Sequence, residues 1–285
     1  MSTMRALALI VLASALWAAS SAASGTTFAL PYDLVVGRDG TIYFTDRGRV
    51  LRVNMKGGQV RVHRRVPGAT ELAGLTRLGD GTLVASDLPT GRIVRIPAKG
   101  AVTTVARVPM PVDVLADPAG TTLWVASIAE DVGLVRVDLA SGTVEPFARV
   151  MRPHGLDRLP NGDLVVHDGR AVSRVDSTTG VITPFANVDA FELTVASNGF
   201  VYGATGSPTG GRVVRISPSG QVTRVAGTGR LGPHRDGRAL QAPMLPSALA
   251  FARDGSLLVT QIEPVPAIRR VDLASGRIST IARGR

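Results

Sequence analysis

The sequence predicts an all-β fold, namely a six-bladed β-propeller built from four-stranded antiparallel blades. Short apolar runs alternate with Asn-Gly and Asp-Gly turns, which indicates antiparallel strands joined by tight turns. The unit recurs six times, and a glycine begins each predicted fourth strand: Gly58, Gly100, Gly142, Gly180, Gly220 and Gly276. These glycines are 42, 42, 38, 40 and 56 residues apart. A period of about 40 residues with four strands per unit is typical of a β-propeller.

Taken in order, the copies predict six blades within one domain that covers residues 26–285. The blades are expected at residues 31–66, 70–108, 110–149, 152–188, 190–227 and 245–284. The last interval of 56 residues becomes 40 when a 16-residue insertion is removed, and residues 228–243 are the natural choice. An open β-solenoid or two stacked sandwiches is the alternative, which we disfavour because a solenoid needs distinct caps.

Two polar residue types recur within the blades. Several second strands end in Asp, and we expect this Asp to cap the following turn: Asp46, Asp87 and Asp168. Every third strand carries an Arg before Val or Ile: Arg52, Arg95, Arg136, Arg174, Arg215 and Arg270. We expect these arginines to bridge blades or to pair with the aspartates, and polyanion binding is the alternative role.

Two segments of the sequence could form the strand that closes the ring. Residues 26–30 precede Pro31 much as residues 146–151 precede Pro153, so they resemble an additional copy of the outer strand. Either this segment or residues 278–282 completes the last blade. The other segment then adds a fifth strand or frays.

Residues 1–24 have the layout of a secretory signal peptide. Arg5 gives a basic start, residues 6–18 are an apolar run, and Ser21-Ala22-Ala23 is a plausible cleavage site. The apolar run is short for a transmembrane helix, and an uncleaved membrane anchor is the alternative. We therefore expect a secreted, periplasmic or otherwise extracytoplasmic protein with no integral membrane segment after cleavage. Because the chain has no Cys, neither disulfides nor thiol chemistry is expected.

The formal net charge of the chain is +10, and arginine supplies nearly all of the positive charge. An exported basic protein meets anionic glycans, wall polymers or membrane headgroups. Nucleic acid is an unlikely partner, because the arginines are spread through the repeats instead of forming a basic run. Solvated strand faces are the simpler explanation of this charge.

The residues that begin each first strand are expected to line one mouth of the central channel. Alignment on the turn glycines gives a first ring: Tyr32, Ala73, Val112, His154, Phe191 and Ser247. The second ring is Asp33, Gly74, Asp113, Gly155, Glu192 and Ala248. Three carboxylates that face one axis repel one another unless they are protonated, solvated or neutralised by a cation. Asp33, Asp113 and Glu192 are therefore candidate ligands for Ca²⁺ or Mg²⁺. The alternative is that they bind backbone N–H groups and water.

His154 is the candidate catalytic residue of this mouth. As a general base it needs a neighbour that sets its tautomer and pKa, and Glu192 in the next blade is the expected partner. A solvated turn histidine is the simpler alternative. Tyr32 and Phe191 flank the same mouth, and Ser247 completes the predicted binding surface.

The blades are similar to the NHL repeat. They share Pro-x-Gly-Leu or Pro-x-Gly-Ile, then an Asp-Gly or Asn-Gly turn, then a strand ending in Asp. Residues 225–246 resemble the glycine-rich connection that NHL proteins place between blades. The likeness covers nearly all of residues 26–285 and is weakest in blade 5. Streptogramin-lyase-like and SMP-30/gluconolactonase-like propellers share this blade pattern.

The resemblance implies two functions and leaves open whether the protein is an enzyme. NHL domains are mainly binding platforms, which implies a module that binds a small molecule, a glycan or a protein at one face. Gluconolactonase-like propellers hold a catalytic divalent cation, which implies a metal-dependent lactonase or lyase that uses His154 and Glu192. The departures are that only one blade has Pro-His-Gly and the second ring has no Asn. A structural envelope protein is a third reading. We expect a monomer.

Overall fold

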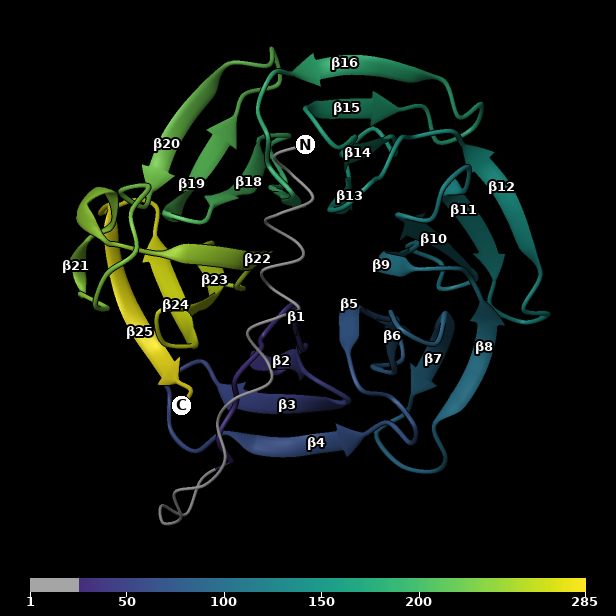
Figure 1. Cartoon of the computed structure of the whole chain (residues 1–285), viewed down its shortest axis with the longest axis horizontal. Coiled ribbons are helices and arrows are strands. Elements are labelled where there is room, and N and C mark those ends of the chain that lie inside the picture. Colours follow the sequence, from purple (N-terminus) through teal and green to yellow (C-terminus); the bar gives the residue numbers. More distant parts are fainter. Residues whose placement is uncertain (1–25) are drawn as a thin grey trace.

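The computed structural model describes residues 26–285 and shows six antiparallel sheets arranged around a central axis (Figure 1). This confirms the predicted fold class. The predicted signal peptide lies outside the described residues. Within residues 26–285 the only helix is a single 3-10 turn, η2 (Ala239–Gln241). No helix in that range is long and apolar enough to cross a membrane.

Each blade runs from an inner strand beside the axis to an outer strand at the rim (Figure 1). The strands of the first three blades are β1 (Leu34–Val36), β2 (Thr41–Asp46), β3 (Arg49–Asn54), β4 (Arg61–Arg65); β5 (Leu72–Arg77), β6 (Leu83–Asp87), β7 (Arg92–Ile96), β8 (Thr103–Arg107); β9 (Pro111–Ala116), β10 (Thr122–Ser127), β11 (Gly133–Asp138), β12 (Val144–Ala148). Those of the last three are β13 (Leu156–Arg158), β14 (Leu164–His167), β15 (Val172–Val175), β16 (Ile182–Ala186); β17 (Glu192–Val195), β18 (Val201–Ser207), β19 (Gly210–Ile216), β20 (Val222–Ala226); β22 (Leu245–Phe251), β23 (Leu257–Glu263), β24 (Ala267–Asp272), β25 (Arg277–Arg283).

The hydrophobic core lies between the blades, not inside any one of them. Six clusters of buried residues are present, and each contains side chains from two neighbouring sheets. Both faces of a middle strand are therefore buried, as in β6, where all five residues are buried. This explains why the second strands read as continuous apolar runs instead of alternating patterns.

Blade 6 is completed by β25, so the second of the two predicted closures is confirmed. The resemblance of residues 26–30 to an outer strand was misleading, because this segment forms no strand. The backbone N–H groups of Ala29 and Leu30 instead donate to the carboxylate of Asp46, both at 2.9 Å. The Phe28 side chain is buried in the cluster between blades 1 and 6. The Arg285 N–H donates to the Phe28 carbonyl at 3.1 Å, which joins the two ends of the described chain.

The predicted insertion supplies the fifth strand of blade 6. Its β21 (Gly237–Arg238) pairs with β25 at the outer edge. The fully buried Arg269 donates to the carbonyl of Arg235 at 2.8 Å and lies 3.3 Å from the Asp236 carboxylate. The insertion is therefore anchored to its blade by a buried guanidinium.

Within residues 26–285, one of the six recurrent arginines forms the expected pair with an aspartate, Arg270 with Asp254 at 2.7 Å. Two of the aspartates that end the second strands pair with other arginines. Arg49 and Arg92, at the start of the third strands, make the 2.6 Å ion pairs with Asp46 and Asp87. Three of the recurrent arginines stack on phenylalanines of their own blades: Arg136 on Phe147, Arg174 on Phe185 and Arg215 on Phe200. Arg174 also donates to the carbonyl of Pro218 in the next blade at 2.7 Å, so it does bridge two blades.

Candidate functional site

The acidic residues of the predicted second ring join neighbouring inner strands. Asp33 accepts the N–H of Leu34 in its own blade at 2.6 Å and the N–H of Leu75 in blade 2 at 2.5 Å. Asp113 accepts the N–H of Val114 at 2.7 Å. Its second oxygen accepts the N–H of Leu156 in blade 4 at 2.8 Å. We call these carboxylates interblade clasps.

A third interblade clasp, Asp157, was missed by the sequence analysis. It accepts the N–H of Arg158 at 2.7 Å and the N–H of Val195 in blade 5 at 2.6 Å. Its position two residues after Gly155 puts it on the same face of the inner strand as the second ring. This two-residue spacing could have identified Asp157 from the sequence as a residue of the channel.

The small residues of the second ring allow the inner strands to approach one another. A Cβ placed on Gly74 would lie 2.6 Å from the Cα of Asp113. A Cβ placed on Gly155 would lie 2.5 Å from the Cα of Glu192. Real Cβ atoms do not occur at such distances, so glycine is required at both positions for steric reasons. The alternation of acidic and small residues is a packing pattern of this ring.

The channel carboxyl groups are harder to ionise than ordinary ones. Burial raises the pKa of Asp33 to about 7 and the pKa of Asp157 to about 6. Burial, followed by the charges of the neighbouring carboxylates, raises the pKa of Asp113 and of Glu192 well above the usual range. These four groups therefore hold protons at pH values where free carboxylic acids have lost them.

The predicted Ca²⁺ or Mg²⁺ ligands do not fit a metal site in this geometry. Both oxygens of Asp33 and of Asp113 already accept backbone N–H groups. Within residues 26–285, no three His, Cys, Asp or Glu side chains are grouped so that they would hold a metal ion. The metal assignment of Asp33, Asp113 and Glu192 stays a prediction.

His154 lies beside a second histidine, His167, with ring centroids 5.6 Å apart. Burial, followed by the charge of His167, lowers the pKa of His154 to about 4. The Nε2 of His167 lies 2.9 Å from Oδ1 of Asp189, and His167 is only 3% exposed. The Nδ1 of His167 is buried and has no hydrogen-bond partner. This group of His154, His167 and Asp189 is called the histidine pair site.

The structure shows His167 and Asp189 as neighbours of His154, and the pairing of His154 with Glu192 stays a prediction. The His154 N–H donates to the carbonyl of His167 at 3.2 Å, which extends the hairpin of β13 and β14. In that hairpin Leu156 pairs with Val166. Counting outward from the Asn-Gly turn would have placed His154 beside the end of β14.

The other predicted mouth residues serve different purposes. Burial, followed by the charge and hydrogen bond of Glu71, raises the pKa of the Tyr32 hydroxyl. The carbonyl of Phe191 accepts the N–H of Gly155 at 2.7 Å, and its side chain stays partly exposed. Ser247 is buried and donates to the carbonyl of Pro31 at 2.7 Å, so it joins blade 6 to blade 1.

No family model and no curated relative matches this chain. Solved structures do. A virginiamycin B lyase from Staphylococcus aureus superposes with a TM-score of 0.62 at 18% identity, over 88% of this chain and 83% of the lyase. The nidogen/laminin complex contains a chain with a TM-score of 0.69 at 16% identity, over 86% of this chain and 93% of that chain. A gluconolactonase from Xanthomonas campestris gives 0.62 at 17% identity, over 83% and 84%. These likenesses establish the fold alone.

Proposed function

We propose that the chain is an exported six-bladed propeller that binds a small molecule, a glycan or a protein at the channel mouth. One observation carries the proposal: ionisable side chains with displaced pKa values converge on one axis from several blades. Asp33 comes from blade 1, Asp113 from blade 3, His154 from blade 4 and Glu192 from blade 5. Strongly displaced pKa values cluster at functional sites. Export is proposed from residues 1–24.

The ligand contacts are assigned to groups that the fold leaves partly exposed. Tyr32, His154 and Phe191 are partly exposed, whereas Ser247 and two of the interblade clasps are buried. An aromatic ring, a phenol and a neutral imidazole offer stacking, donation and acceptance to one ligand. Such a set suits a neutral or weakly polar ligand such as a glycan.

A thermal-shift screen tests the proposal, with glucono-1,5-lactone, chitooligosaccharides and a panel of soluble glycans as probes. A ligand at about one hundred times its Kd stabilises a native state by about 2.7 kcal/mol, so we expect a hit to raise Tm by several degrees. His154→Ala or Phe191→Ala should remove the shift. His63→Ala is the matched control, because His63 lies on the outer strand β4 against Tyr43. Equal loss of the shift in the control would exclude the channel mouth.

The histidine pair site favours a second candidate, acid–base catalysis of lactone hydrolysis or of an elimination. Because the pKa of His154 is held at about 4, its imidazole is unprotonated at neutral pH and accepts a proton. The Asp189 carboxylate lies 2.9 Å from the Nε2 of His167, which lies beside His154. A virginiamycin B lyase in which one histidine is replaced by alanine is described as catalytically inactive with quinupristin, which supports this candidate by analogy.

The pH profile of lactone hydrolysis tests this second candidate. We expect the rate to rise with pH through about 4, because only the unprotonated form of His154 acts as the base. His154→Gln should lower kcat by about 10²- to 10⁴-fold. Asp189→Asn should lower it less. Initial rates of glucono-1,5-lactone hydrolysis in a pH-stat between pH 3 and 8 give the measurement. A rate that rises with pH only near the ordinary histidine pKa of 6.5 would rule out His154 as the base.

A further inference from the structure

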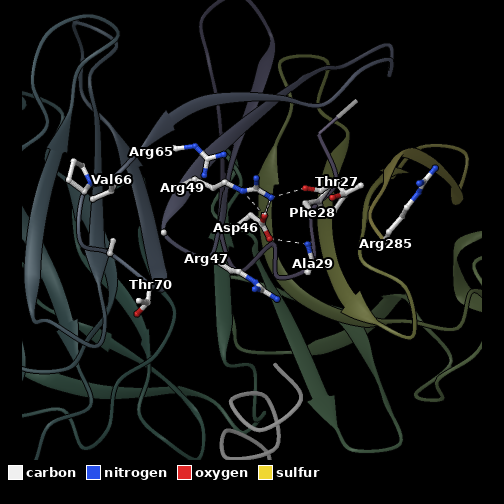
Figure 2. Close-up of a pocket in the computed structure, with 13 residues that line it drawn as sticks. Thr27, Phe28, Ala29, Asp46, Arg47, Arg49, Arg65, Val66, Thr70 and Arg285 are labelled. Atoms are coloured by element: carbon white, nitrogen blue, oxygen red, sulfur yellow. Dashed lines mark hydrogen bonds and ion pairs between the residues drawn. The ribbon is translucent and has the colours of Figure 1, made fainter. Parts of the chain in front are cut away.

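A pocket of about 820 Å³ lies beside blade 1, next to the segment that leads into blade 2 (Figure 2). The turn between β2 and β3, the segment that leaves β4, the segment around Phe28 and the residue Arg285 form its walls. Its volume is within the range of pockets that bind small molecules. None of the residues of the histidine pair site lines it.

The side chains that line this pocket carry an uncompensated positive charge. Four arginines line it, Arg47, Arg49, Arg65 and Arg285, together with one acid, Asp46. Asp46 is already fully engaged, because it pairs with Arg49 at 2.6 Å and accepts two backbone N–H groups. Four positive charges less one negative charge leave a side-chain charge of +3.

The guanidinium groups of the three remaining arginines have no carboxylate partner within the described residues, although the charge of Arg47 acts on the Tyr32 hydroxyl. Among residues 26–285, no hydrogen bond or ion pair involves the guanidinium of Arg47, Arg65 or Arg285, whereas Arg49 donates to both Asp46 and the Thr27 carbonyl. Arg47 and Arg65 are exposed to solvent. Figure 2 shows them on either side of the ion pair between Arg49 and Asp46. Guanidinium groups without carboxylate partners are available to bind anionic oxygens.

The backbone that presents Arg47 is rigid and strained. Arg47 has a φ of 56°, a left-handed conformation that is unusual for any residue other than Gly, Asn or Asp. The Leu72 N–H donates to its carbonyl at 2.8 Å, and the Val66 N–H donates to the carbonyl of Gly48 at 3.0 Å. A Cβ on Gly48 would overlap the carbonyl of Ala69. The backbone of Arg47 is therefore fixed by the fold, whereas its exposed side chain is free to adjust to a ligand.

A second pocket, of about 560 Å³, lies at the corresponding place in blade 4 and shows what is specific to the first. Its acid, Asp168, caps the turn by accepting the N–H groups of Arg170 and Ala171. Only two arginines line it, and Met151, Ile182 and Phe185 make much of its wall. The excess of free guanidinium groups thus belongs to the pocket beside blade 1.

We propose that the pocket beside blade 1 binds a small polyanion that carries at least two phosphate groups, either free or attached to a sugar. Phosphate oxygens match the fork geometry of guanidinium groups, and two such groups engage Arg47 and Arg65 together. Arg285 adds long-range attraction. No channel-mouth residue lines this pocket. The two sites are neighbours, since the charge of Arg47 acts on Tyr32, but the proposed polyanion binding does not depend on the function proposed for the mouth.

Calorimetric titration of the full-length chain with inorganic pyrophosphate at low ionic strength tests this site. We expect binding of pyrophosphate to be tighter than binding of monophosphate. The double substitution Arg47→Ala and Arg65→Ala should weaken it at least tenfold. Arg224→Ala removes one charge from an exposed position on the outer strand β20, and it should change the affinity by less than twofold. Thermal unfolding of each variant verifies that it is folded.

Two results would overturn the proposal. The first is the absence of saturable pyrophosphate binding by the wild-type chain. The second is that Arg224→Ala loses as much affinity for pyrophosphate per removed charge as the Arg47→Ala and Arg65→Ala double variant. That result would mean that general electrostatic attraction, and not the pocket, binds the anion. A titration with glucose 1,6-bisphosphate distinguishes a phosphorylated sugar from a free polyphosphate as the ligand. Tighter binding than that of pyrophosphate would indicate a phosphorylated sugar, and weaker binding would indicate a free polyphosphate. Because His154 and Phe191 take no part in this test, its failure would leave the channel-mouth proposal standing.

Discussion

Raising the pH from 6.5 to 8.5 is expected to lower the melting temperature of this protein. The cause is the group of channel carboxyl groups, whose pKa values are raised in the native state. The pKa of Asp33 is about 7 in the fold, whereas its ordinary value is 3.8. Across this pH range the native state loses protons that the unfolded chain has already lost. Stability falls with rising pH wherever the native state binds more protons than the unfolded state.

The histidines act in the opposite direction, and the chosen pH window limits their contribution. Burial lowers the pKa of His63, His154 and His234 below the ordinary value of 6.5. Near and below that pH the unfolded chain binds protons that these native histidines do not bind, so their contribution to stability increases as the pH rises. Unfolded histidines are half protonated at about pH 6.5 and neutral by about pH 8, so their opposing contribution fades over the window. The carboxyl effect persists to its upper end.

Urea and thermal unfolding at several pH values measure this effect. One unit of pKa difference corresponds to about 1.4 kcal/mol, so Asp33 with its pKa of about 7 should lose about 1 kcal/mol, or roughly 2–4 °C in Tm, between pH 6.5 and 8.5. The raised pKa values of Asp113 and Glu192 act in the same direction. Glu192→Gln should flatten the slope, because it removes one raised pKa and the repulsion with Asp113 and Asp33. Glu145→Gln is the control, since Glu145 is exposed on the outer strand β12. A Tm that is constant or rises over this window would contradict the assigned proton binding.

Gly155→Ala is expected to be among the most destabilising single substitutions in the chain. The added Cβ would lie 2.5 Å from the Cα of Glu192 and 2.6 Å from the N of Leu193, so β13 and β17 would have to separate. The 2.7 Å hydrogen bond from the Gly155 N–H to the Phe191 carbonyl would be lost with that separation. Overpacking against backbone that cannot move costs about 3 kcal/mol or more.

Gly79→Ala provides the matched control for this substitution. Gly79 also lies outside the left-handed region, and a Cβ there would meet nothing within 4 Å. We expect Gly155→Ala to lower Tm by roughly 6–12 °C. The control should change Tm by at most about 2 °C. Similar effects of the two substitutions would mean that the inner strands have room to adjust, and the packing explanation of the second ring would then fail.

The fold was readable from the sequence because propeller blades are local structures. Each blade consists of consecutive hairpins, and residues such as Gly162 and Gly180 mark its turns with φ values of 97° and 74°. The repeat period then fixes the number of blades. The strands of a blade pair with their neighbours in sequence, so no contact between distant segments is needed to recognise a blade.

Features that depend on contacts between blades were the ones that sequence reasoning missed. The role of Asp33 as an interblade clasp depends on the Leu75 N–H, 42 residues away. The partnership of His167 with Asp189 depends on the path of the segment that leaves blade 4. Residues 26–30 matched the outer-strand pattern, yet Asp46 binds their N–H groups and no strand forms. Local pattern does not encode which distant group reaches a given atom.

The closure of the ring has a consequence for how this chain is assembled. No blade borrows a strand from the far end of the chain, because blades 1 and 6 are each complete within their own stretch of sequence. Every blade therefore pairs its strands within its own stretch of sequence, and it buries its apolar faces only when a neighbouring blade packs against it. The seam between blades 1 and 6 joins Phe28, Ser247 and Arg285 from distant parts of the described chain. Until that seam is formed, the apolar side chains of blades 1 and 6 that it buries are open to solvent, so closure of the ring is the step that covers the last apolar faces.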